Sequence, residues 1–204
     1  MADEFHPVAL GGAWDGALLG PVAEINEQLL ERLRLMAQQE APKAPRLVAL
    51  LREDWRRLNA AALRRLSGCP YLLLDAGFSE PACWERSSTG GVVRDGGASG
   101  GYFESPDGVS LVRHALVFAR YLARSHRLSA RVLLAMAPEC AERLAARSLR
   151  DLEALAGIAP AWIAPRWDGQ ITVWRQMLQA AVTGQEESLR RAQLRGLQLM
   201  ATLW

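Results

Sequence analysis

The sequence predicts a mainly α-helical protein in which two helical units are joined by a glycine-rich linker. Apolar residues recur at steps of three and four along most of the chain, which is the spacing of one helix face. Residues 87–101 contain three Gly-Gly pairs, and glycine raises the entropy cost of ordering a chain, so this segment predicts a linker or a loose hairpin. The balance of charge changes sign near the same segment, which favours a boundary there.

The charge of the chain differs between its two halves. Residues 1–108 hold 11 basic and 15 acidic side chains, whereas residues 109–204 hold 13 and 7. We therefore divide the chain into residues 1–105, a helical unit of unknown role that ends in the linker, and residues 106–204. Eight arginines and only two acids lie in residues 110–150, which is the composition of a surface that contacts phosphates or an acidic partner. The alternative is a general preference for arginine, because the chain has a single lysine.

The first unit contains two predicted helical stretches. Residues 22–40 have an amphipathic pattern that ends before Pro42 and Pro45. Residues 46–66 form a second amphipathic stretch, and the two would pair as a hairpin. The apolar residues 71–74 are too few to distinguish a buried strand from a helical turn, so both readings stay open.

The second unit begins with a helix after Gly108 that carries two stripes. The apolar stripe consists of Leu111, Ala115, Phe118 and Leu122. A basic stripe consists of Arg113, Arg120, Arg124 and Arg127. We expect one face of this helix to pack and another to be basic.

Shorter helices are predicted to follow. Their ranges are residues 130–136, 138–147, 149–156, 171–182 and 186–203. Ser148 and Asp151 have the spacing of a capping box, in which side chain and backbone satisfy each other at a helix start. Two prolines within residues 159–167 predict an extended segment there.

The cysteines and the hydropathy pattern restrict the class of protein. Cys69, Cys83 and Cys140 are widely spaced and form no C-x-x-C pair, so we expect no disulfide framework and no metal site. No apolar run approaches the roughly 20 residues that span a bilayer, and the amino terminus begins with acids. We expect a cytoplasmic protein that does not associate with a membrane.

No catalytic motif is present in the sequence. It contains no P-loop, no dinucleotide fingerprint, no Gly-x-Ser-x-Gly and no His-Glu-x-x-His, so we expect no cofactor, no catalytic residue and no enzymatic activity. The enzymatic alternative rests on Asp75, Glu80 and Glu85, and it requires these carboxylates to converge in one pocket.

Residues 111–167 resemble the D subunit of the bacterial flagellar master transcription regulator. The matching positions are Leu122-Ala-Arg124, Leu134-Ala-Met-Ala-Pro-Glu139, Ala141, Leu144-Ala145, Leu149, Leu152, Leu155-Ala156 and Arg166-Trp167-Asp168. Residues 171–201 resemble the closing helices of that family more weakly. Ala135 and Ile163 stand where the family has a glycine and an intersubunit cysteine, and residues 1–105 resemble nothing in that subunit.

The resemblance implies an all-α, helix-turn-helix-like unit that forms a homodimer through its first helix and acts on promoters with a second regulator subunit. The candidate interface for a dimer or partner is then the stripe of Leu111, Ala115, Phe118 and Leu122. From charge and position, the candidate DNA-binding residues are Arg127, Arg131, Arg143, Arg147 and Arg150.

Two functions are therefore expected from the sequence. The first is a non-enzymatic transcription regulator or co-regulator that acts as a dimer on DNA. The alternative is a protein-binding adaptor of a motility or secretion system that does not bind DNA, in which the arginines contact an acidic partner.

Overall fold

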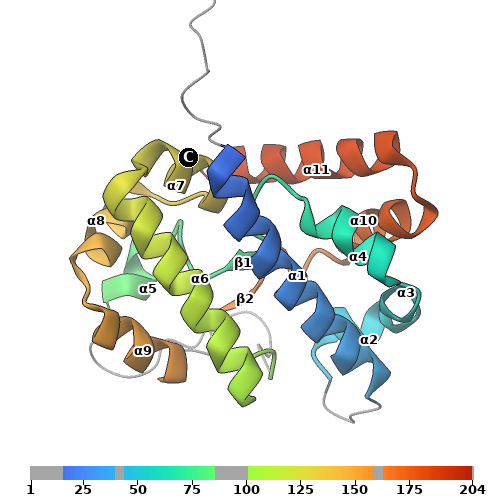
Figure 1. Ribbon diagram of the computed structural model, residues 1–204, viewed down its shortest axis with the longest axis horizontal. Coiled ribbons are helices and arrows are strands. Elements are labelled where there is room, and N and C mark those ends of the chain that lie inside the picture. The colour runs from blue at the N-terminus through green and yellow to red at the C-terminus, as the bar shows by residue number, and fades with distance from the viewer. Residues whose placement is uncertain (1–15, 40–43, 86–100, 159–162, 204) are drawn as a thin grey trace, which may run out of the picture.

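The computed structural model describes residues 16–39, 44–85, 101–158 and 163–203 (Figure 1). Most of these residues are helical, which confirms the mainly α prediction. The first half forms α1 (Gly16–Gln38), α2 (Arg46–Leu50), α3 (Arg52–Arg56), α4 (Ala60–Ser67), β1 (Leu74–Asp75) and α5 (Pro81–Glu85). The second half forms α6 (Pro106–Ser125), α7 (Arg127–Leu134), α8 (Pro138–Ala146), α9 (Leu149–Ile158), β2 (Ala164–Pro165), α10 (Ile171–Thr183) and α11 (Glu186–Ala201). Residues 87–100 of the predicted linker lie outside the described residues.

The first predicted helix is confirmed as α1, which begins six residues earlier than its apolar pattern. Its predicted face is buried and packs against α4 and α3. The second predicted stretch is helical but not continuous, because Leu51 leaves the helical region (φ −116°, ψ 21°) and separates α2 from α3. Asn59 then starts α4 by accepting a hydrogen bond from the backbone N–H of Ala62 at 2.9 Å.

The predicted long helix of the second unit is confirmed as α6, against which α7, α8 and α9 all pack. Ser105 caps its start by accepting a hydrogen bond from the N–H of Gly108 at 3.3 Å. A Cβ atom at Gly108 would lie 2.6 Å from the Cα atom of Phe103, so only glycine fits this first turn. The capping box is also confirmed, because Ser148 N–H donates to Asp151 Oδ2 at 2.9 Å and Asp151 N–H donates to Ser148 Oγ at 3.1 Å.

The ambiguous segment at 71–74 ends in a short antiparallel strand pair. Leu74 of β1 pairs with Pro165 of β2, which is part of the segment predicted to be extended; residues 159–162 lie outside the described residues. The next residue, Arg166, is only 3% exposed. Its guanidinium donates to the carbonyl oxygens of Leu72 at 2.9 Å and Leu134 at 3.0 Å, so one buried side chain links three segments.

One continuous core includes residues from both predicted units. α10 packs against α3 and α4, where the rings of Trp55 and Trp174 lie 5.5 Å apart. Arg65 of α4 donates to the carbonyl oxygen of Ala181 at 2.7 Å. The boundary at residue 105 stays a prediction, but the described parts of both units pack against each other.

The last helix, α11, lies very close to the segment before β1. A Cβ atom at Gly196 would lie 2.1 Å from the Tyr71 hydroxyl oxygen and 2.8 Å from Cη2 of Trp167. Tyr71 and Trp167 meet edge to face with their ring centroids 5.7 Å apart. Glycine at 196 is therefore what allows α11 to cover these two rings.

Candidate nucleic-acid interface

The five candidate arginines lie on three short helices around α6. Arg127 and Arg131 are on α7, Arg143 is on α8, Arg147 follows it, and Arg150 is in the first turn of α9. α7 ends at Ala135, which adopts the left-handed conformation (φ 52°) that glycine adopts most readily.

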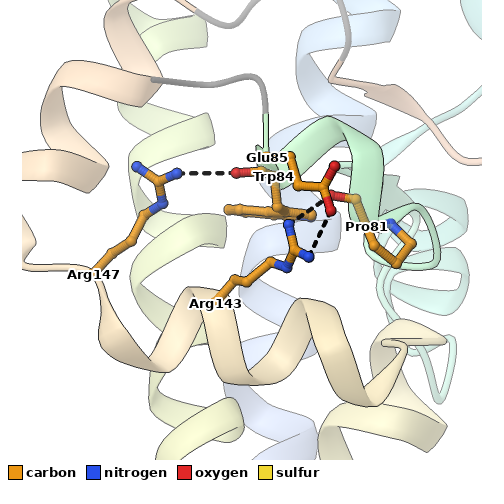
Figure 2. A network of polar contacts seen from close by, with 5 residues as sticks. All are labelled: Pro81, Trp84, Glu85, Arg143 and Arg147. Carbon is orange, nitrogen blue, oxygen red and sulfur yellow. Dashed lines mark hydrogen bonds and ion pairs between the residues drawn. The ribbon is translucent and has the colours of Figure 1, made fainter. Parts of the chain in front are cut away.

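Arg143 and Arg147 are directed at α5 (Figure 2). Arg143 Nη2 lies 2.6 Å from Glu85 Oε1, and Arg147 Nη2 donates to the carbonyl oxygen of Trp84 at 3.1 Å. The indole of Trp84 is buried and donates to the carbonyl oxygen of Gly77 at 3.0 Å. Arg147 thus binds a carbonyl at the carboxyl end of α5, where helix carbonyls have no partner within the helix, whereas Arg143 contacts Glu85 and, at 3.5 Å, the carbonyl oxygen of Pro81 at the start of α5. Both side chains hold α5 in place. Either arginine would have to break its contact with α5 before it could bind a phosphate.

Arg127, Arg131 and Arg150 are exposed. Arg150 lies beside the capping box of α9, where hydrogen bonds from Ser148 lower the pKa of Asp151 below its ordinary value. Arg124, on the last turn of α6 that precedes Arg127, is exposed as well. The exposed arginines therefore form two groups, one on α7 and its junction with α6 and one at the start of α9; α7 lies at one end of α6 and α9 beside the other (Figure 1).

Exposed apolar side chains accompany these exposed arginines. Leu128, next to Arg127, is 70% exposed, and Leu149, next to Arg150, is 55% exposed. Large exposed apolar residues beside cations are more typical of a surface that contacts protein than of one that contacts only phosphates.

The four residues assigned to a dimer or partner interface lie in the core of the chain itself. The exposed fractions of Leu111, Ala115, Phe118 and Leu122 are 3%, 0%, 9% and 0%. Val117 and Tyr121 are the exposed large apolar side chains of the described α6 helix, at 39% and 49%. Neither residue belongs to the predicted apolar stripe, although their spacing of four residues on another face of the helix is a signal that could have identified them.

The residues of the enzymatic alternative each have a local interaction. Asp75 Oδ1 accepts from the N–H of Phe78 at 3.3 Å, Glu80 lies 3.5 Å from the Cys83 sulfur, and Glu85 pairs with Arg143. Each carboxylate thus has a structural role in the turn before α5 or in α5 itself.

The three cysteines are buried free thiols. Burial raises the pKa values of Cys69 and Cys140 to about 12, so neither thiol ionises near neutral pH. Across the described residues, no three or more His, Cys, Asp or Glu side chains are grouped to hold a metal ion. None of the helices in the described ranges has both the length and the apolar character required to cross a membrane.

Comparison with known proteins gives no relative for this chain. No family model, no curated protein and no solved structure matches it. Its function must therefore be argued from its own residues.

Proposed function

We propose that the chain is a non-enzymatic, cytoplasmic transcription regulator or co-regulator that acts as a dimer, with a second regulator subunit, on DNA. The observation that supports this proposal most is the exposure of Arg127 and Arg131 on α7 and of Arg150 on α9, two short helices that both pack against α6. Guanidinium groups on helices can contact the phosphates of a duplex and set the register of a protein on it.

The number of exposed arginines sets the expected salt dependence of DNA binding. Each neutralised phosphate contributes about −0.9 to the slope of log K against log salt concentration. Three arginines give a slope of about −2.7, so that affinity falls roughly 40-fold between 50 and 200 mM salt. If Arg143 and Arg147 left α5 and joined them, the slope would approach about −4.5.

The test is fluorescence anisotropy of a mixed-sequence 30-bp duplex in a sodium chloride series. Arg127→Glu combined with Arg150→Glu should lower affinity at least tenfold and flatten the slope by about 2. The matched control is Arg190→Glu combined with Arg191→Glu, which changes two exposed arginines of α11 and lowers the net charge equally. If both pairs weaken binding to the same extent, binding depends on net charge alone and this surface is not the interface.

A second function has its own support, namely the exposed Leu128 and Leu149 beside the arginines. We infer from them the alternative of an adaptor that binds an acidic protein partner of a motility or secretion system. Such a chain would not bind the duplex in low salt, whereas Leu128→Ser combined with Leu149→Ser would abolish its partner contact. In the DNA-binding function, the same leucine variant would keep its affinity for the duplex.

A further inference from the structure

An apolar groove lies between α1 and α6, which run side by side in opposite directions (Figure 1). The direction follows from two contacts, because Gln28 Oε1 lies 3.3 Å from His114 Nδ1, and Arg32 Nη1 donates to Ser105 Oγ at 2.7 Å. The groove has a volume of about 610 Å³. Its apolar lining consists of Pro21, Ile25, Val117, Phe118 and Tyr121.

Two of these side chains project from the floor of the groove. Ile25 and Phe118 are buried, whereas Val117 and Tyr121 are 39% and 49% exposed. The Tyr121 hydroxyl lies 2.9 Å from Nε2 of His126, so the ring is held in place by a neighbour. An ordered, half-exposed aromatic ring beside an apolar groove is typical of the centre of a protein interface.

The two sides of the groove carry opposite charge. On the α1 side, Glu24 lines the groove and Glu31 lies two helical turns further along; both are exposed, and Glu31 also pairs with Arg34 of α1 at 3.6 Å. On the α6 side, Arg113 lines the groove and is exposed. A surface that is acidic along one edge and basic along the other can complement a second copy of itself.

We propose that this groove is the contact surface of a homodimer in which α1 of one copy lies over α6 of the other. The inference rests on the dimeric state proposed above but not on DNA binding. Half of the surface comes from α1, which lies in residues 1–105, outside the segment that resembles the flagellar regulator subunit.

The symmetry of such a dimer determines which residues meet. We place the two-fold axis parallel to the groove, so that rotation about it sets α1 of one copy over α6 of the other. Rotation about an axis does not move a residue along that axis, so each residue and its copy lie at the same height. His114 is at the height of Gln28, and Arg113 is next to it. Arg113 of one copy therefore lies between the heights of Glu24 and Glu31 of the other, each about one turn away. Val117 and Tyr121 of both copies are then buried together at the centre.

The first measurement is the oligomeric state of the full chain by sedimentation equilibrium without DNA. We expect a dimer for the wild-type chain, and a dissociation constant at least about 100-fold higher for Val117→Glu, because the carboxylate would be buried without a partner. The matched control is Leu194→Glu, an exposed apolar residue on α11 (58%). A wild-type chain that is a monomer at every concentration, or a Val117→Glu variant that dimerises normally, overturns the inference.

The second measurement uses charge reversal. Glu24→Arg combined with Glu31→Arg makes both edges basic, and Arg113→Glu makes both edges acidic, so each variant alone should be a monomer. A mixture of the two variants should form a heterodimer, because every contact between the copies again joins opposite charges. Recovery on mixing also shows that both variants are folded, and failure to recover overturns the inference.

The outcomes separate this inference from the proposed function. A monomer that binds the duplex with the expected salt slope overturns the groove dimer and leaves the regulator proposal standing. A groove dimer that does not bind DNA supports the inference and contradicts DNA binding. A dimer that is insensitive to Val117→Glu uses another surface, which overturns only the groove assignment.

Discussion

Reversal of the charges of Arg143 and Arg147 tests whether these side chains hold α5 against α8. The ion pair of Arg143 with Glu85 is partly exposed (36% and 57%), so it contributes about 0.5 kcal/mol. The bond from Arg147 to the Trp84 carbonyl is partly buried and comes from a charged donor, so it contributes about 1.5 kcal/mol. Repulsion between Glu85 and a glutamate at position 143 adds about 0.5 kcal/mol. The double variant should therefore lose about 2–3 kcal/mol of unfolding free energy.

The assay is urea unfolding of the double variant Arg143→Glu with Arg147→Glu, followed by circular dichroism at 222 nm. The matched control is Arg127→Glu combined with Arg150→Glu, which should change the free energy of unfolding by less than about 0.5 kcal/mol because both side chains are exposed. Equal stability of the two double variants would refute the structural role of Arg143 and Arg147. It would also return Arg143 and Arg147 to the set of residues available for phosphate contact.

Three further predictions concern the core and the caps. Gly196→Ala should lower the free energy of unfolding in a urea titration by about 2–3 kcal/mol, because the added methyl group overlaps two rings. The control is Gly157→Ala, at a helical site with nothing within 4 Å, which should raise the free energy of unfolding by about 0.5 kcal/mol. Arg166→Met should cost about 2–4 kcal/mol by the same measurement, because two buried carbonyls lose their donor. The pKa of Asp151 in the folded chain is lowered from its ordinary value of 3.8. Its carboxylate therefore stabilises the fold fully above pH 3.8, and this stabilisation is lost as the pH falls through the folded-state pKa. Asp151→Ala should therefore be less stable than the wild type at neutral pH, and the difference should disappear as the pH falls below the lowered folded pKa, as measured by thermal melts across the pH range.

Local signals predicted the helices of the second unit well. The position of Pro138 at the start of α8 and the capping box before α9 depend on residues within one helical turn, so both can be recognised in the sequence. The break between α2 and α3 has no such signal. The apolar spacing continues through Leu51 and Trp55, and the irregular backbone at Leu51 becomes visible only in the structure.

The candidate site was less predictable because its partners are distant in sequence. Counting charges identified the arginines, but Glu85 lies 58 residues from Arg143, and no pattern in the sequence joins them. The apolar stripe of α6 also could not be interpreted fully from the sequence. Its spacing predicts burial of Leu111 and Phe118, but the same spacing is compatible with burial by a second copy or by the chain's own helices.

The packing of α10 on α3 and α4 has a consequence for how this protein folds during its synthesis on the ribosome. Trp55 and Arg65 are made early, yet their partners Trp174 and Ala181 emerge more than a hundred residues later. Until then, the nascent first half presents its apolar faces to water and to chaperones. The core therefore cannot be completed until α10 has been synthesised and packs against α3 and α4. A pulse of protease during synthesis would therefore cut the first half of the nascent chain and spare the finished protein.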